Sequence, residues 1–215
     1  MQNIIICSLA ATASMVVQSR CFVGRIILRR YLASVILILP LLPFAKEASF
    51  PFWAIASTDL YPTLAFALIF STMTILVTSK IGRHSENTRI YRQVRTREGN
   101  VKLLISNALS WTLYLTAYEF LFRGYLFYSC LQFTTVENAF IIGVVAYSLA
   151  HLFKSEKEFL LSVPFGGLLC YITFVTNNVW AAVAIHVALA LSYDMIALQA
   201  NPYFTKSPIT KKLSI

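Results

Sequence analysis

Five ionisable side chains lie within or at the ends of apolar stretches, where charged groups are costly, and they are the first candidates for chemistry: Glu119, Arg123, His151, His186 and Asp194. Glu119 and Arg123 are four residues apart, with the acid nearer the N-terminus, which favours an i,i+4 pair on one helix face. One reading is a structural ion pair that makes both charges tolerable in lipid. The other is an arginine that braces a catalytic or metal-binding carboxylate.

The two histidines lie in different apolar stretches from each other and from Glu119. Helix rise places Glu119, His186 and His151 at about 6, 10 and 18 Å below the outer edge of the membrane. Boundary errors are comparable to these differences, so the three could meet at one level. They would then be tentative ligands for Zn2+, which could activate a water. Each histidine alone reads as a helix-to-helix hydrogen-bonding residue. Asp194 is a weaker candidate ligand and reads as a carboxylate near the cytoplasmic mouth.

Apolar runs supply the elements that must position these residues. A spanning helix needs roughly 20 apolar residues. The runs predict an all-α fold, a polytopic transmembrane helix bundle of about six to seven spans. They are residues 4–17, 31–45, 60–79, 103–133, 139–153, 159–176 and 179–198.

Three of these runs carry signs of irregularity. Run 103–133 would extend about 46 Å as one helix, so it must tilt, break or lie partly in the interface, and Arg123-Gly124 is the expected place for a change of direction. Pro40 and Pro43 are expected to kink or end the second run. Pro164 with Gly166-Gly167 is expected to interrupt the sixth.

Composition excludes a water-soluble domain. Of the 215 residues 58% are hydrophobic and 13% are charged, whereas a soluble domain carries about a quarter charged residues. The net charge of +9 is concentrated between apolar runs, in blocks at 20–30 and 80–102 and in the tail. This pattern indicates cytoplasmic loops of a multi-pass protein, expected in the cell's inner membrane, and not a nucleic-acid-binding face.

Three short motifs lie on separate runs: Tyr118-Glu119-x-x-x-Arg123, Tyr147-x-x-x-His151 and His186-x-x-x-Ala190. They resemble the patterns E-E-x-x-x-R, F-x-x-x-H and H-x-x-x-N of the CAAX protease and bacteriocin-processing (CPBP) family of glutamate-type intramembrane metalloproteases. The likeness covers roughly residues 85–195.

The resemblance implies catalytic roles for Glu119, Arg123, His151 and His186. The sequence departs from the family at Tyr118, where the first Glu activates the attacking water, and at Ala190, where an Asn helps to stabilise the oxyanion. Either Glu119 has taken over as the base or the chain is catalytically weak or inactive.

Two functions follow from this comparison. The first is an intramembrane endopeptidase that cleaves membrane-associated, prenylated or leader-type substrates through a water activated by Glu and His groups. The alternative is an inactive relative that acts as a membrane scaffold or immunity-type partner. The expected partners are the lipid bilayer and a peptide or protein substrate, with no nucleic acid. The expected division of the chain is N-terminal spans and basic linker at 1–84, a protease-like core at 85–198 and a basic cytoplasmic tail at 199–215.

The charge pattern makes a topology prediction. Single cysteines introduced into 80–102 or beyond residue 200 should react with an impermeant thiol reagent only after the membrane is opened, because positively charged loops are retained in the cytoplasm. Labelling of residues 80–102 in intact cells would show that the protein has the opposite orientation in the membrane.

Overall fold

Helices make up almost all of the computed structural model within the residues that it describes, which are 2–18, 26–41, 53–84, 101–151 and 156–199. Within these ranges there is no strand, which confirms the all-α class. A 3-10 helix, η1 (Leu39–Leu41), follows α2, and a π-helix, η4 (Phe120–Phe127), joins α4 to α5. The α-helices are α1 (Gln2–Gln18), α2 (Ile26–Ile38), α3 (Ser57–His84), α4 (Val101–Glu119), α5 (Tyr128–Phe133), α6 (Val136–Leu149), α7 (Glu156–Thr176) and α8 (Trp180–Gln199).

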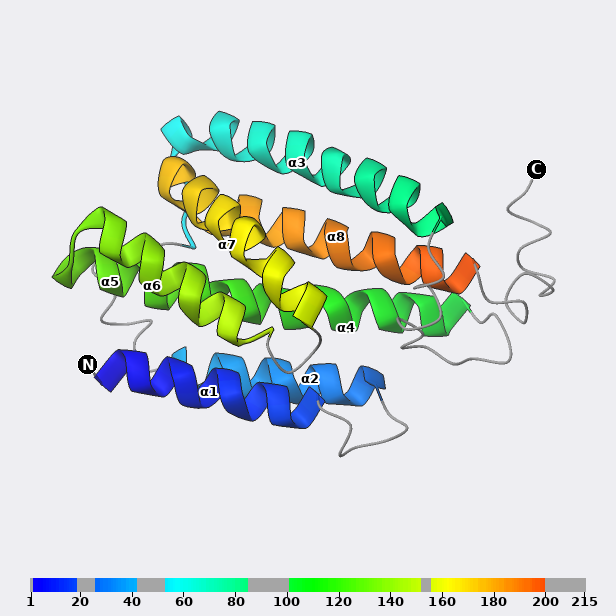
Figure 1. Ribbon diagram of the computed structural model, residues 1–215, viewed down its shortest axis with the longest axis horizontal. Helices are drawn as coiled ribbons and strands as arrows, with labels where there is room; N and C mark the ends of the chain where they lie inside the picture. Colours follow the sequence, from blue (N-terminus) through cyan, green and yellow to red (C-terminus); the bar gives the residue numbers. More distant parts are fainter. Residues whose placement is uncertain (1, 19–25, 42–52, 85–100, 152–155, 200–215) are drawn as a thin grey trace.

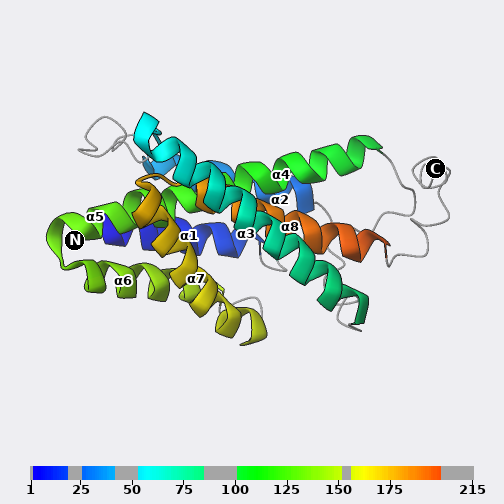
Figure 2. The same ribbon diagram turned by 90° about the horizontal axis from the view of Figure 1, so that it is seen from above.

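In Figure 1 α4 lies between the α1–α2 pair on one side and α8 with α3 on the other, and Figure 2 shows that α3 and α7 run obliquely to the long axis of the molecule. One flank is formed by α1 packed on α2, which in turn packs on α4. On the other flank α8 packs against α4 and α3 packs along α8. Helices α6 and α7 pack on each other, and the short helix α5 packs on α6. Thus α4 and α8, which carry Glu119 and His186, are neighbours in the centre of the bundle.

The surface is apolar and several interior side chains are polar, which is the arrangement expected in lipid. On α3, Leu68 is 72% exposed, whereas Glu119 and Arg123 are completely buried. In the described residues two helical stretches are long and apolar enough to cross a membrane, Ser57–Lys80 and Glu156–Thr176. Shorter apolar helices cover Val136–Leu149 and Trp180–Ile196.

The long run 103–133 forms a helical path whose hydrogen bonding changes midway. The α-helical pattern of α4 ends at Glu119, and the π-helix η4 contains both Arg123 and Gly124. All but the first residue of η4 are buried. The irregularity expected at Arg123-Gly124 is therefore present as a π segment. Such segments often occur at functional sites.

The prolines have different outcomes. Helix α2 ends at Ile38 and Pro40 lies in η1, as expected, while Pro43 lies outside the described residues. The interruption expected at Pro164 is wrong, because α7 continues through it from Glu156 to Thr176. Neighbouring helices in a membrane bundle can compensate for the hydrogen bond that a proline removes.

The predicted start of the second run, residue 31, is wrong, because two basic residues before it are already helical. Arg29 and Arg30 were expected in a cytoplasmic block, but helix α2 already begins at Ile26 and includes both. Arg30 is only 2% exposed. The remainder of that block, the middle of the basic linker at 85–100 and the tail from 200 lie outside the described residues, so the membrane orientation stays a prediction.

Close packing of α6 on α7 makes a stability prediction. A Cβ at Gly166 would lie 2.7 Å from Cδ1 of Tyr147, whereas one at Gly167 would make an ordinary 3.9 Å contact with Val144. Both Gly→Ala changes gain about 1 kcal/mol of helix propensity. The free energy of unfolding of Gly166→Ala should nevertheless be about 1–3 kcal/mol lower than that of Gly167→Ala, because the added methyl group overpacks the contact with Tyr147. Thermal unfolding in detergent measures the difference, and equal stabilities would contradict this packing.

Candidate active site

A buried carboxylate holds the site together. Glu119, at the end of α4, accepts a 2.5 Å hydrogen bond on Oε1 from Nδ1 of His186 on α8. Its other partner is Arg123, whose NH1 lies 3.2 Å from Oε1 and 3.1 Å from Oε2. The expected i,i+4 pair is therefore present. The sequence did not predict that His186 would complete it.

Arg123 is also held by an aromatic ring. Its guanidinium lies 3.9 Å from the centroid of the Tyr147 ring on α6, a cation–π contact that is strongest when desolvated. This contact connects the first motif to the second through Tyr147, one helical turn before His151. Sequence reasoning noted Tyr147 only as a motif position. An arginine within an apolar run needs an aromatic side chain to cover it, and this requirement could have identified the role of Tyr147.

His186 presents two different sides. A carboxylate only accepts hydrogen bonds, so the Nδ1 that faces Glu119 carries the proton. In the neutral imidazole the second nitrogen, Nε2, is then an acceptor. The ring packs edge-on against Tyr118 and Phe165, with centroids 5.9 and 5.6 Å away. The site thus holds an imidazole in one tautomer, which is the usual preparation of a histidine base.

Tyr118 stands between the two histidines. Its ring makes edge contacts with His151 and His186, at centroid distances of 6.3 and 5.9 Å. Its hydroxyl is buried and has no hydrogen-bond partner among the described residues. A buried hydroxyl without a hydrogen-bond partner is costly. A polar group of a bound ligand could supply the partner that this hydroxyl lacks.

His151 lies on the far side of Tyr118 from His186. Its Nδ1 is 3.0 Å from the backbone oxygen of Tyr147, and the residue is 7% exposed. The carbonyl can only accept, so this nitrogen is the donor and Nε2 is the second acceptor of the site. Glu119, Arg123 and His186 are therefore in direct contact, and His151 joins them across the Tyr118 ring.

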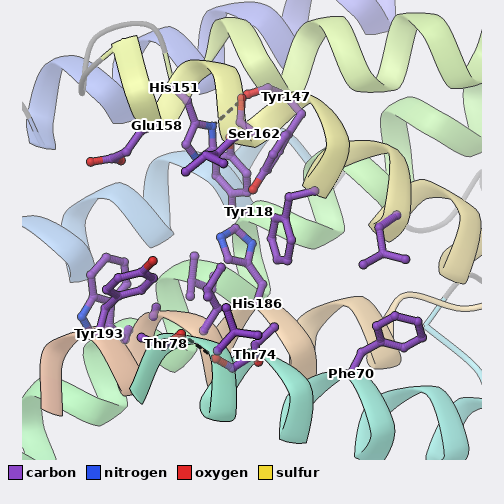
Figure 3. A pocket seen from close by; sticks show the side chains of 18 of the residues that line it. Phe70, Thr74, Thr78, Tyr118, Tyr147, His151, Glu158, Ser162, His186 and Tyr193 are labelled. Atoms are coloured by element: carbon purple, nitrogen blue, oxygen red, sulfur yellow. Dashed lines mark hydrogen bonds between the residues drawn. The ribbon is translucent and has the colours of Figure 1, made fainter. Parts of the chain in front are cut away.

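A cavity of about 510 Å³ opens beside these residues (Figure 3). Its lining includes Tyr118, His151 and His186, but among the described lining residues neither Glu119 nor Arg123 appears. Apolar side chains of α3 and α7 form much of the remaining wall, including Phe70, Met73, Val77, Leu161, Phe165 and Leu168. The Glu119–Arg123 pair therefore lies behind the lining, whereas the two imidazoles and the Tyr118 ring are part of the lining.

The predicted zinc site needs three ligands directed at one point. The described ranges contain no group of three His, Cys, Asp or Glu side chains that could hold a metal ion. Glu119 is already engaged by Arg123 and His186, and each histidine uses Nδ1 in a hydrogen bond, so that only its Nε2 could ligate. Two nitrogens fall short of the three protein ligands of a catalytic zinc site. These residues do not fit a metal ion in this arrangement, so no step is derived through one.

Asp194 lies apart from the Glu119 cluster. It accepts hydrogen bonds from Asn107 and Trp111, and it also lines the cavity. The sequence analysis considered it a weak partner for His186, but the structure places it in a separate polar network. Asn107 and Arg30, which complete this network, were not identified as candidates.

The fold and the site define a class, a helical membrane protein whose buried Glu–Arg pair supports a histidine-lined cavity. Residues 100–192, from α4 into α8, match the family described as type II CAAX prenyl endopeptidase Rce1-like. The match covers less than half of the chain, and over these residues it confirms the resemblance inferred from the three motifs. No curated protein and no solved structure matches the chain significantly.

The buried Glu119–Arg123 pair makes a prediction about stability. Arg123→Met leaves a fully buried carboxylate with His186 as its remaining partner, and loss of one member of a buried pair typically costs about 3–5 kcal/mol. Adding Glu119→Gln in the same protein should recover much of that loss, because the uncompensated charge is removed. Unfolding of the single and double variants in detergent measures the coupling. Additive losses would show that the pair does not stabilise the fold.

Proposed function

We propose that the chain is a membrane-embedded endopeptidase in which His186, oriented by Glu119, activates the attacking water. The observation that carries this proposal is the position of His186. One ring nitrogen is bound to a completely buried carboxylate, while the same ring lines the cavity. This is the arrangement by which carboxylate–histidine pairs prepare a general base.

The chemistry follows from the two acceptor nitrogens and the phenol. Nε2 of His186 takes a proton from water as the water oxygen attacks the peptide carbonyl carbon. The Tyr118 hydroxyl donates a hydrogen bond to the oxyanion that forms. The imidazolium then returns the proton to the departing nitrogen as the carbon–nitrogen bond breaks, giving a carboxylic acid and an amine. His151, through its Nε2, orients the water.

Glu119 and Arg123 are positioning residues in this mechanism. Oε1 of Glu119 accepts hydrogen bonds from His186 and Arg123, and the side chain is fully buried and is not among the described lining residues of the cavity. It is therefore poorly placed to take a proton from a cavity water itself. Its role is to hold the tautomer of His186, and Arg123 keeps it ionised by a short charge contact.

The substrates that fit this proposal are membrane-associated peptides, including prenylated and leader-type segments. The apolar wall contributed by α3 and α7 suits a lipid-like or apolar segment, and the polar wall presents the imidazoles. Membership of a prenyl endopeptidase family supports the same substrate class. We place the bundle in the inner membrane with about six to seven spans and with the basic linker and tail in the cytoplasm.

One observation favours a second candidate, a relative that binds but does not hydrolyse. Tyr118 occupies the position at which the family pattern has a carboxylate, and Ala190, which lines the cavity, lacks an oxyanion donor. A chain with these changes could keep the cavity and act as a scaffold or immunity-type partner.

Hydrolysis of a membrane peptide library by the purified protein separates the two candidates. His186→Ala should reduce cleavage about 100-fold or more, as removal of a general base does. Tyr118→Phe should cost about 10²–10³-fold by removing the oxyanion donor. Tyr114→Phe is the matched control, since Tyr114 lies one turn earlier on α4 and also lines the cavity. It should retain near wild-type activity.

Other outcomes favour the alternative. If the wild type is inactive and Tyr118→Glu creates activity, the chain is a non-hydrolysing relative that lacks only its base. If wild type and His186→Ala cleave equally, His186 is not the base. Metal analysis of the same preparations would show whether zinc copurifies.

A further inference from the structure

A second polar network is buried at the interface of α2, α4 and α8. Oδ2 of Asp194 accepts hydrogen bonds from Asn107 Nδ2 at 2.9 Å and from Trp111 Nε1 at 2.5 Å. The same oxygen lies 3.7 Å from NH2 of Arg30. Three helices therefore hold one carboxylate oxygen in a fixed position.

Arg30 completes the network from outside the family-matched segment. Its NH1 donates to Asn107 Oδ1 at 2.6 Å and to Ser110 Oγ at 3.3 Å. Its guanidinium also lies 3.8 Å from the centroid of the Trp111 ring. Because Arg30 is 2% exposed, it acts as a fixed internal cation that orients Asp194.

The other oxygen of Asp194, Oδ1, makes no polar contact within the described residues, and every polar contact of this carboxylate there is made by Oδ2. The residue is 8% exposed, and it lines the same cavity as His186. Oδ1 is therefore an acceptor held ready on a rigid support, which is how a recognition group is usually built.

Asp194 is not the only acidic side chain in the described lining of the cavity. Glu158 also lines the cavity, and no Lys or Arg is among the described lining residues. Arg30 lies close to Asp194 but is not among the described lining residues. Figure 3 shows Glu158 and Tyr193, the neighbour of Asp194 in sequence, on the side of the cavity away from Phe70.

We propose that Asp194 binds the cationic side chain of a lysine or arginine in the segment that occupies the cavity, and that it thereby selects the substrate. Asp194 follows His186 by eight residues on α8, a rise of about 12 Å. An extended peptide covers that distance in about three or four residues. The cation is thus expected three or four positions from the residue held at His186. The proposal rests on the proposed function only in requiring that the cavity holds a peptide.

Binding without turnover tests this assignment. The probes are apolar membrane peptides that carry a photoreactive group at one fixed position, and crosslinking of this group near His186 reports that the cavity is occupied. The peptides differ only in the position of a single lysine. Wild-type protein should bind one of these peptides about 10-fold more tightly than the same peptide with norleucine, the gain expected for a hydrogen bond to a charged group. Asp194→Asn should remove that preference, because the amide still accepts from Trp111 and Asn107 but presents no charge to the cavity.

Two controls keep the result interpretable. Glu158→Gln should leave a clear lysine preference, so loss of the preference in this variant alone would overturn the assignment to Asp194. If Asp194→Asn does not fold, acetyl-lysine peptides on wild-type protein supply the test, since they keep the length and lose the charge. Equal binding of lysine and acetyl-lysine would overturn the proposal. Cleavage is not measured, so absence of hydrolysis with an intact lysine preference would refute only the proposed reaction.

Discussion

The buried carboxylate of Glu119 is the constraint on which the rest of the site depends. A charged group in a membrane bundle is costly unless it is paired and hydrogen-bonded. Arg123 supplies the charge from the same helix and His186 supplies a hydrogen bond from another. Tyr147 then covers the guanidinium from a third helix. Satisfying one acid thus requires α4, η4, α6 and α8 to come together.

This requirement also explains the division between the support and the working surface of the cavity. Glu119 and Arg123 are fully buried behind the lining, where they stabilise each other in a medium of low polarity. Tyr118, His151 and His186 line the cavity and are hydrogen-bonding groups that can exchange protons. The family match identifies residues 100–192 as protease-like, and they contain Glu119, Arg123 and all three of these cavity-lining residues.

A second constraint comes from Arg30 on α2. It lies outside the family-matched segment, yet it donates a hydrogen bond to Asn107, which is inside that segment. It also lies close to Asp194, just beyond the end of the segment. The N-terminal helices are therefore more than a membrane anchor. They contribute a buried cation that fixes one side of the cavity, so α2 and the core are expected to form one cooperative unit.

The amino-acid pattern was enough to predict the helical regions and the ion pair within one of them. Apolar runs located every helical region described, and the four-residue spacing of Glu119 and Arg123 predicted their contact, because one helical turn fixes that neighbour. Only the tertiary structure decided that His186 binds Glu119, that Tyr118 separates the histidines, and that Arg30 lies beside Asp194. Helix rotation and register set these contacts. They depend on packing between distant segments, such as Gly166 against Tyr147, which no local spacing encodes.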